Sequence, residues 1–337
     1  MIEDCARRTE ARVHRQEPAM RPDRVGNVPR IAYLGPEGTF TEAALLQMVA
    51  KGMVPGPAED AGGFTPVRTD STPGALSAVR EGRADYACVP IENSIDGTVL
   101  PTLDSLAAGS PLQIYAELTL DVAFTIVVRP GHDGPVRTVA AFPVAAAQVR
   151  HWLAANLRDA EVVPAHSNAA AAHDVAEGRA DAGVSTRLAA ERCGLDIMAA
   201  DVVDEPNART RFVLVGLPGT PPPATGADRT AVVLRLVNEP GALVSAMTEF
   251  SIRDIDLTRI ESRPTRTELG TYMFFLDCAG HIDDDPVAEA LKALHRRCVD
   301  VRYLGSWPTE SAAGAPPPRL DEATTWLEGL RAGSGGA

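Results

Sequence analysis

A short motif that occurs twice limits the folds open to this chain more than any other feature. Residues 79–85 read Val-Arg-Glu-Gly-Arg-Ala-Asp and residues 175–181 read Val-Ala-Glu-Gly-Arg-Ala-Asp, identical at six of seven positions. In both copies a helix-like segment ends at glycine, which is common at helix C-termini, and an apolar, strand-like segment follows. The repeat therefore predicts an α/β protein with two lobes of similar architecture.

Polar residues follow the strand-like segment in both copies. The first strand leads to Asn93 and Ser94, and the second leads to Ser185 and Thr186. Ligands of two-lobed α/β proteins usually bind in the crevice outside the strand ends. We therefore expect a ligand site between the lobes, with one of these loops on each wall.

Two predicted helix starts are candidate anion sites. A Gly-Pro-Glu-Gly turn at residues 35–38 precedes a helix that begins at Thr39, Phe40 and Thr41, and Ser167 and Asn168 begin a second helix. Unpaired N–H groups at a helix start bind anions. The turn lacks the glycine spacing of a dinucleotide fingerprint and the Gly-Lys-Ser/Thr of a P-loop, so no nucleotide cofactor is predicted.

The hexapeptide at residues 207–212 combines a hydroxyl with cations. Thr210 lies between Arg209 and Arg211, and Phe212 and an apolar run follow directly. A strand that begins here would hold the hydroxyl in a positive field, where it could bind an acidic small molecule and move a proton. Taken alone, the hexapeptide is more typical of a polar strand edge with solvated arginines.

The composition changes along the chain and predicts its division into parts. Residues 217–229 are rich in proline and glycine, as linkers are. The segment after them has the β-α-β-β-α-β order of a ferredoxin-like domain. We expect a flexible extension at 1–29 (with Met20 as an alternative start), a two-lobed domain at 30–216, the linker at 217–229, the ferredoxin-like domain at 230–307 and a loose tail at 308–337.

Within the two-lobed domain, lobe one is expected to cover about residues 31–106 and 205–216, and lobe two about residues 118–200. The apolar residues 118–128 are expected to form one long strand that crosses between the lobes. In the tail, one short helix is expected near residues 320–330.

Charge and cysteine content exclude several classes of protein. The net charge of −13 argues against nucleic acid or an anionic membrane as a partner. The five cysteines are scattered and form no C-x-x-C pair, so neither disulfides nor zinc are predicted, and the cytoplasm is the expected location. The histidines show no metal-binding spacing, and no apolar run is long enough for a transmembrane helix.

Four motifs together resemble the monofunctional prephenate dehydratase family, which carries a C-terminal ACT regulatory domain. The resemblance extends from about Arg30 to about Trp307, in the order and spacing of the family. The motifs are Gly-Pro-Glu-Gly-Thr-Phe-Thr at 35–41, Val-Pro-Ile-Glu-Asn-Ser at 89–94 followed by Gly97, Thr-Arg-Phe at 210–212 and Glu-Ser-Arg-Pro at 261–264. The family implies two lobes like those of type II periplasmic binding proteins, plus a ferredoxin-like ACT domain.

The resemblance implies a carbon–oxygen lyase that needs no cofactor or metal. The family dehydrates and decarboxylates prephenate to phenylpyruvate in phenylalanine biosynthesis. It implies that Thr210 is essential, either as proton donor to the departing hydroxyl or in positioning the substrate. Arg211 is expected near a substrate carboxylate, Asn93 and Ser94 are expected to donate hydrogen bonds, and Phe212 either binds or packs.

The remaining expected substrate contacts are weaker candidates. The helix starts at Thr39, Phe40 and Thr41 and at Ser167 and Asn168 are suited to the two carboxylates of prephenate. Ser185 and Thr186 are as well explained by cap or loop hydrogen bonds as by substrate binding.

The ACT resemblance implies a phenylalanine sensor that lowers activity. Asn238, Gly241, Ala242 and Leu243 lie at a helix start suited to the carboxylate of the amino acid. Glu261, Ser262, Arg263 and Pro264 are expected to close the pocket across a subunit interface, which implies a homodimer or homotetramer. A domain used only for dimerisation is the alternative.

Three other functions fit parts of the chain. Arogenate dehydratase would use the amino analogue of the substrate. A non-catalytic two-lobed ligand-binding protein is disfavoured by the missing export signal and lipobox. A ligand-binding transcriptional regulator is disfavoured by the acidic charge and by the lack of a helix-turn-helix before Arg30.

Overall fold

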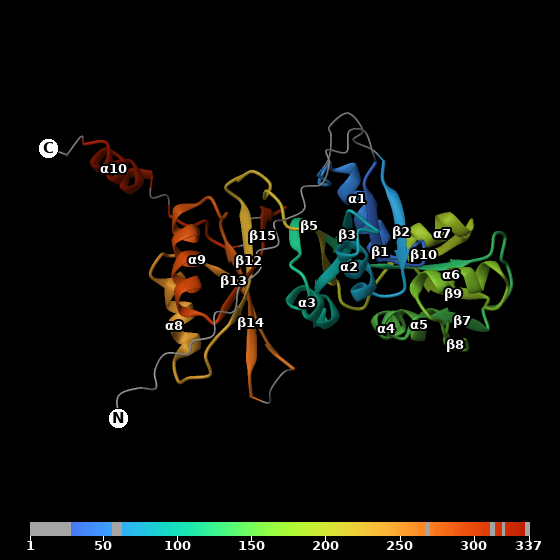
Figure 1. The fold of residues 1–337 in the computed structure, drawn as a ribbon. Coiled ribbons are helices and arrows are strands. Elements are labelled where there is room, and N and C mark those ends of the chain that lie inside the picture. Colours follow the sequence, from blue (N-terminus) through green and yellow to red (C-terminus); the bar gives the residue numbers. More distant parts are fainter. Residues whose placement is uncertain (1–27, 56–62, 267–269, 311–313, 319–320, 334–337) are drawn as a thin grey trace, which may run out of the picture.

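The computed structural model of this chain describes residues 28–55, 63–266, 270–310, 314–318 and 321–333. Three units lie in a row, with lobe one in the middle, lobe two on one side and the C-terminal domain on the other (Figure 1). Residues 1–27 of the expected extension, and parts of the tail, lie outside the described residues. Within the described ranges, no helix has both the length and the apolarity needed to cross a membrane.

Lobe one is built on a mixed sheet with the strand order β2-β1-β3-β11-β5. β1, β2 and β3 are parallel, whereas β11 runs antiparallel to both β3 and β5. Helix α1 covers one face, and α2 and α3 cover the other. The elements are β1 (Arg30–Leu34), α1 (Phe40–Ala50), β2 (Thr65–Thr69), α2 (Thr72–Arg80), β3 (Tyr86–Asn93), β4 (Gly97–Thr98), which pairs with β3, α3 (Leu100–Ala107), β5 (Gln113–Asp121) and β11 (Arg209–Gly216).

Lobe two repeats this pattern, as the sequence repeat predicts. Its sheet has the order β10-β6-β9-β7-β8, in which β7, β8 and β9 are parallel and β6 is antiparallel to its neighbours. The elements are β6 (Phe124–Val128), β7 (Thr138–Ala141), α4 (Pro143–Gln148), α5 (Arg150–Asn156), β8 (Glu161–Pro164), α6 (Asn168–Ala176), β9 (Ala182–Ser185), α7 (Arg187–Cys193) and β10 (Asp196–Val202).

The repeated motif has the same structural task in both lobes. Asp85 accepts a hydrogen bond from the N–H of Arg30 at 2.9 Å, and Asp181 accepts one from the N–H of Thr138 at 3.0 Å. Each aspartate thereby joins the start of its own strand to the start of the neighbouring parallel strand. Hydrogen bonds from the N–H groups of Arg137 and Thr138 lower the pKa of Asp181.

The crossing between the lobes differs from the expected single strand. β5 ends at Asp121 and β6 begins at Phe124, and the two strands belong to different sheets. The expectation of one strand over residues 118–128 was wrong, because each half pairs with the sheet of its own lobe. The chain returns to lobe one through the segment between β10 and β11.

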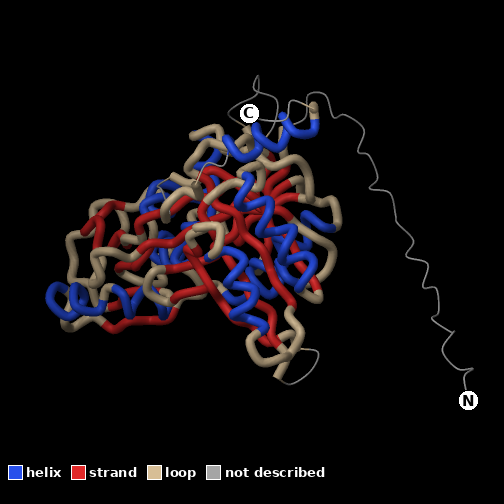
Figure 2. The backbone as a smooth tube through the Cα atoms, turned by 90° about the vertical axis from the view of Figure 1, so that its left-hand side faces the viewer, coloured by secondary structure: helices blue, strands red, loops and turns tan. Residues whose placement is uncertain are grey.

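The C-terminal domain has the ferredoxin-like order expected from the sequence. Its antiparallel sheet runs β13-β14-β12-β15, and α8 and α9 cover one face. A further helix, α10, lies in the tail beyond this domain (Figure 1, Figure 2). The elements are β12 (Asp228–Arg235), α8 (Ala242–Ser251), β13 (Leu257–Pro264), β14 (Tyr272–Ala279), α9 (Asp285–Arg297), β15 (Asp300–Pro308) and α10 (Asp321–Arg331).

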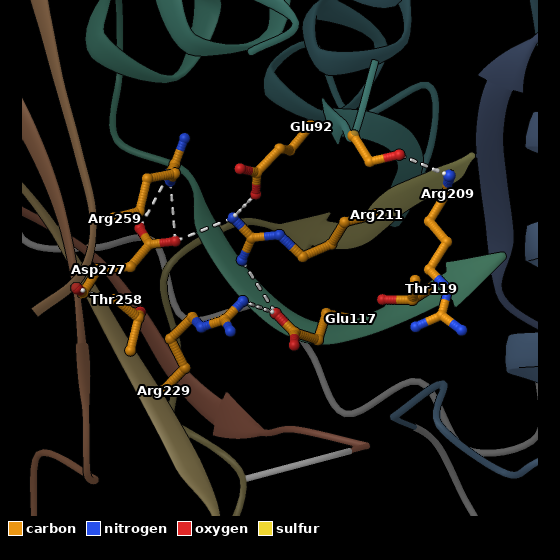
Figure 3. A pocket seen from close by; sticks show the side chains of 10 residues that line it. Glu92, Glu117, Thr119, Arg209, Arg211, Arg229, Thr258, Arg259 and Asp277 are labelled. Carbon is orange, nitrogen blue, oxygen red and sulfur yellow. Dashed lines mark hydrogen bonds and ion pairs between the residues drawn. The ribbon is translucent and has the colours of Figure 1, made fainter. Parts of the chain in front are cut away.

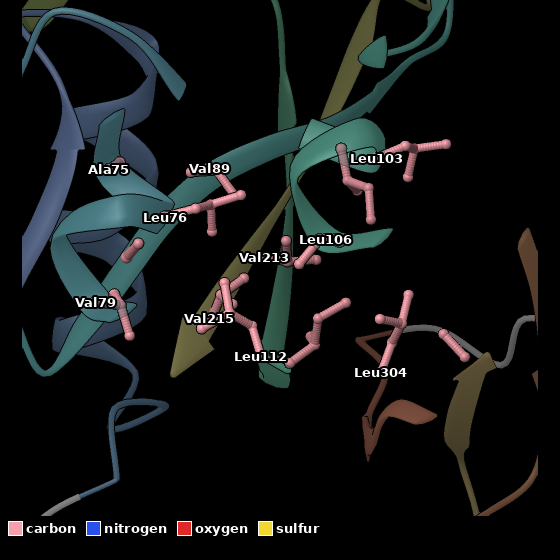
Figure 4. Close-up of a cluster of buried hydrophobic side chains, with 14 of the residues drawn as sticks. Ala75, Leu76, Val79, Val89, Leu103, Leu106, Leu112, Val213, Val215 and Leu304 are labelled. Carbon is pink, nitrogen blue, oxygen red and sulfur yellow. The ribbon is translucent and has the colours of Figure 1, made fainter. Parts of the chain in front are cut away.

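The other face of the C-terminal sheet packs directly on lobe one. Leu112 and Val215 of lobe one share a core cluster with Phe275, Leu304 and Trp307 of the C-terminal domain (Figure 4). The approach is close, because a Cβ atom on Gly305 would lie 2.4 Å from the carbonyl oxygen of Ile114. The two units therefore form one continuous apolar interior rather than two loosely tethered bodies.

Candidate active site

Thr210 and Asn93 form a hydrogen-bonded pair where β11 and β3 meet. The two residues are register partners, and Asn93 Nδ2 donates to Thr210 Oγ1 at 2.8 Å. Asn93 Oδ1 accepts from the N–H groups of Ile95 at 2.8 Å and Asp96 at 3.0 Å, which fixes the orientation of the amide. Because Asn93 donates to the oxygen, the hydroxyl proton of Thr210 can point to a ligand. Thr210 is 8% exposed.

Ser94 ties the loop after β3 to the start of β11. Its N–H donates to the carbonyl oxygen of Arg209 at 2.8 Å, and its hydroxyl donates to that of Asn207 at 3.1 Å. The N–H of Arg209 donates to Ser94 Oγ at 2.8 Å. Ser94 therefore supports the backbone on which Thr210 lies.

Arg211 points away from Thr210, because successive side chains of a strand lie on opposite faces of the sheet. Its guanidinium contacts Glu92 at 2.9 Å, Glu117 at 3.1 Å and Asp277 at 3.0 Å (Figure 3). Asp277 belongs to β14 of the C-terminal domain. The structure thus does not bring the Arg211 guanidinium to the Thr210 hydroxyl, and a direct substrate contact by Arg211 stays a prediction that this geometry disfavours.

The carboxylates around Arg211 belong to a larger cluster that is buried except for Glu92, whose side chain is 42% exposed. The cluster, called the interdomain network below, consists of Glu92, Glu117, Arg211, Arg229, Arg259 and Asp277. Burial alone lowers the pKa of Arg211, but Asp277, Glu117 and Glu92 outweigh it and raise that pKa. Burial alone raises the pKa of Asp277, but Arg259 and Arg211 hold it well below its usual range.

Phe212 returns to the face of Thr210 and packs in the core beneath α1. It is 2% exposed and shares a cluster with Leu45 and Met48. Its position supports packing rather than a broad contact with a ligand.

The start of α1 lies at the junction of the lobes. Thr39 caps the helix by accepting from the N–H of Glu42 at 3.3 Å, and Thr41 is buried. The ring of Phe40 meets Phe124 of lobe two edge-to-face, with centroids 5.6 Å apart. Thr39 and Phe40 therefore lie where the two lobes face each other.

The corresponding residues of lobe two also bond to backbone. Ser167 caps α6 by accepting from the N–H of Ala170 at 3.0 Å, and Ser185 Oγ donates to the carbonyl oxygen of Asn168 at 2.6 Å. Thr186 caps α7 and donates across the junction to the carbonyl oxygen of Gly38 at 2.5 Å. The Oδ1 atom of Asn168 is buried and has no partner among the described residues, so it is able to accept from a ligand.

One cross-lobe contact was missed at the sequence level. Arg192 of α7 contacts Glu37 at 2.6 Å and Glu42 at 2.7 Å. Glu42 is 3% exposed and also accepts from the N–H of Gly38 at 2.5 Å. Nothing in the sequence near Arg192 indicates this pairing, since its partners are 150 or more positions away in the chain.

The expected effector residues fall into two groups. Asn238, Ala242 and Leu243 line a cavity of about 120 Å³ in the C-terminal domain, and Gly241 borders a neighbouring cavity of about 240 Å³. Glu261 and Arg263 instead reach lobe one. Glu261 contacts Thr98 at 3.2 Å, and Arg263 contacts Asp104 at 3.0 and 3.1 Å.

Ser262 and Pro264 lie on the same edge strand, β13, and are exposed. Within one chain, these four residues of β13 are thus not assembled around Asn238. Among the residues that the structure describes, no cluster of His, Cys, Asp and Glu side chains is suited to hold a metal.

Comparison with known proteins supplies the family. Residues 31–219 match the prephenate dehydratase family model, and residues 230–296 match the ACT domain model. A prephenate dehydratase of Mycobacterium sp. (strain JLS) is 76% identical over 306 residues, which is 91% of this chain and 97% of the relative. That of Mycobacterium tuberculosis (strain H37Ra) is 70% identical, over 90% of this chain and 94% of the relative.

A solved structure also matches over most of its length. The prephenate dehydratase of Arthrobacter aurescens in complex with L-Phe is 38% identical, with a TM-score of 0.78. The match covers 90% of this chain and 99% of that chain.

Proposed function

The chain belongs to the prephenate dehydratase family, in the form with a C-terminal ACT domain, and we propose that its catalytic centre is the Thr210–Asn93 pair. As a member it is a carbon–oxygen lyase that converts prephenate to phenylpyruvate. The observation that carries the proposed centre is the 2.8 Å hydrogen bond from Asn93 Nδ2 to Thr210 Oγ1, at the ends of two neighbouring strands. It holds the hydroxyl rigidly beside the junction of the lobes.

The chemistry needs one proton and no redox step. Thr210 donates its proton to the ring hydroxyl, which leaves as water. The ring carboxylate leaves as carbon dioxide, and the electron pair of the broken carbon–carbon bond completes the aromatic ring. Water then reprotonates Thr210, so that one proton is consumed per turnover. A hydroxyl is a weak acid, and the Asn93 N–H stabilises the charge that develops on its oxygen.

We place the two substrate carboxylates at the helix starts that face each other across the lobes. Thr39 and Phe40 begin α1, and Ser167 and Asn168 begin α6. The positive end of each helix favours an anion. Asn168 Oδ1 is a buried acceptor without a partner among the described residues, so it suits a donor such as the substrate hydroxyl rather than a carboxylate. Thr41, Ser185, Thr186 and Phe212 are assigned to shape the walls, since their polar groups bond to backbone or their side chains are buried.

For the ACT domain we propose phenylalanine as the effector. The relative from Arthrobacter aurescens was solved with L-Phe, and the cavity beside Asn238 adjoins the start of α8. Val237 and Tyr272 line that cavity and are 44% and 49% exposed, as expected where a second subunit covers them. A homodimer or homotetramer would let β13 of one subunit close the cavity of another.

We propose domain boundaries at 30–216 for the catalytic part, 217–229 for the linker and 230–307 for the ACT domain. The ranges matched by the two family models and the separate sheets support them. We propose a cytoplasmic location, which the free cysteines at positions 88, 193, 278 and 298 support.

The test of the catalytic assignment is Thr210→Ala. We expect kcat to fall by about 10²–10³, because a preorganised donor to the leaving group is lost. Turnover is measured by the ultraviolet absorbance of phenylpyruvate after prephenate is added. Thr210→Ser keeps the hydroxyl and is expected to keep most of the activity. A folded Thr210→Ala enzyme with near-normal turnover would remove the assignment. Parallel assays with arogenate test the substrate preference.

A further inference from the structure

The interdomain network reaches the two residues that flank the catalytic pair. Arg211 follows Thr210 in β11, and Glu92 precedes Asn93 in β3. Arg211 and Glu92 bond to each other at 2.9 Å on the face of the sheet opposite the Thr210 hydroxyl. The residues next to Thr210 and Asn93 in the chain thus bond to each other on the opposite face of the sheet.

The ACT domain supplies the other side of this contact. Asp277 of β14 is 1% exposed, accepts from Arg211 at 3.0 Å and accepts two hydrogen bonds from Arg259 at 2.8 and 2.9 Å (Figure 3). Glu117 accepts from Arg211 at 3.1 Å and from Arg229 of β12 at 2.7 Å. The Arg211 guanidinium is therefore fixed between two lobe-one carboxylates, Glu92 and Glu117, and one ACT carboxylate, Asp277.

The ladder between β11 and β3 is irregular directly beside the catalytic pair. Its register shifts between Arg211 and Phe212, whereas β11 pairs with β5 without a shift from Arg209 to Leu214. Such irregularities interrupt a ladder and re-aim side chains, and they are common next to active sites. On the β3 side, the contacts of Arg211 therefore add to the backbone pairing that orients Thr210.

The network has the means to adopt a second arrangement. The Nε atoms of Arg211 and Arg229 and one Nη atom of Arg259 are buried without partners among the described residues. These groups border a cavity of about 240 Å³. Spare donors beside this cavity would let the guanidinium groups exchange carboxylate partners, and that exchange would supply the second state that control by a ligand requires.

The same strand links the network to the cavity proposed for phenylalanine. Tyr272 and Phe274 of β14 line that cavity, and Asp277 lies three residues further along. A shift of β14 caused by a ligand in the cavity would therefore move Asp277.

We propose that Arg211 is a positioning residue for Thr210, and that the ACT domain controls it through Asp277. Phenylalanine lowers turnover by displacing Asp277 and with it the Arg211 guanidinium. This inference rests on the proposed roles of Thr210 and of phenylalanine.

The test is Asp277→Asn in the full chain, which removes the charge and keeps the shape. We expect kcat to fall on the order of 10- to 100-fold, since misplacing a reacting group by about 1 Å can cost that much, while KM for prephenate changes by less than about threefold. Inhibition by phenylalanine should weaken, although isothermal titration still shows phenylalanine binding. Circular dichroism measures the fraction of each variant that is folded, and kcat is calculated per folded molecule.

The matched control is Arg302→Met. Arg302 of β15 also joins the ACT domain to lobe one, by donating to the carbonyl oxygens of Leu106, Ala108 and Gly109 at 3.1–3.2 Å, but it does not touch β11. It should keep normal kcat and normal inhibition. If Asp277→Asn instead keeps both, or changes them no more than Arg302→Met does, the proposal is overturned.

Two further variants separate the possible outcomes. If Asp277→Asn does not fold, Arg259→Lys removes the two-point contact to Asp277 and is read by the same criteria. Thr210→Ala is assayed in parallel. An active Thr210→Ala enzyme contradicts the catalytic assignment, whereas an inactive one beside a normal Asp277→Asn enzyme contradicts only the coupling.

Discussion

At the scale of single residues, the alternation of β11 separates two tasks. Thr210 bonds to Asn93 on one face of the sheet, and Arg211 bonds to Asp277 of the ACT domain on the other. Thr210, the proposed proton donor, and Arg211, the proposed link to the ACT domain, are thus adjacent in the chain. This arrangement explains why a cation directly beside the hydroxyl in sequence need not touch the substrate.

Asn93 offers a sharp residue-scale prediction. Asn93→Ala removes the donor to Thr210 Oγ1, so we expect kcat to fall by about 10²–10³ with a smaller change in KM. The steady-state rate of phenylpyruvate formation measures it. Asn156→Ala is the matched control, because the Asn156 amide donates only to the carbonyl oxygen of Trp152 in its own helix among the described residues. Equal rates for the two variants would contradict the role of Asn93.

Sequence reasoning reached some of these residues and not others, for physical reasons. Thr210 and Asn93 were named because they lie in motifs of the family that the chain resembles, and the structure brings their side chains together. Their catalytic roles stay predictions. The face on which Arg211 lies depends on which side of the sheet meets the ACT domain, and that contact is not local. Asp277 did leave a signal, since it is a lone acid inside an apolar strand, and such a residue is seldom buried unless paired.

At the scale of elements, α7 joins the lobes through Thr186, which caps its start, and Arg192, which lies in its last turn. Thr186 and Arg192 of lobe two bond to Gly38, Glu37 and Glu42 of lobe one. In the proposed site prephenate enters between the lobes, so we expect these bonds to open and reform during turnover. Their strength then sets how much of the enzyme is closed and competent to bind.

Arg192→Met tests this cross-lobe contact. The change leaves the buried Glu42 carboxylate without its cation when the lobes close, with hydrogen bonds from Gly38 and Tyr33 remaining, at a cost of about 1–3 kcal/mol. We expect KM for prephenate to rise about 5- to 150-fold with a smaller effect on kcat, measured by initial rates. Arg187→Met is the control from the same helix, since Arg187 pairs with Asp201 within lobe two at exposed positions. An unchanged KM for Arg192→Met would show that the contact does not govern closure.

At the scale of the whole molecule, the two-lobed part was the most predictable. The repeated motif indicated two similar sheets because the same Asp joins two parallel strands in each lobe. The docking of the ACT domain on lobe one was not predictable, because Gly305, Leu304 and Trp307 read only as parts of a strand. Their close fit to β5 depends on the complementary shapes of two folded surfaces, and a local sequence pattern does not determine such complementarity.

The buried charge of Asp277 makes the junction of the two units sensitive to acid. Arg259 and Arg211 hold its pKa well below the value of about 3.9 that it has in an unfolded chain. A lowered pKa contributes stability that is fully present above the unfolded value and is lost as the pH falls below about 4, where the unfolded chain binds a proton that the folded chain excludes. Thermal unfolding midpoints of the wild type should therefore drop steeply on acidification below pH 4.

Asp277→Asn carries no such group, so its unfolding midpoint should be lower than that of the wild type near pH 7, where breaking a buried pair costs about 3–5 kcal/mol. The gap between the two midpoints should narrow as the pH falls from about 4 toward 2, because the unfolded wild type binds a proton there that the folded wild type excludes. A shallower acid dependence should remain in the variant, since Asp181 of lobe two also has a lowered pKa. Midpoints that stay a constant distance apart from about pH 7 to about pH 2 would mean that Asp277 is not charged at the junction, and the electrostatic account of domain contact would then be wrong.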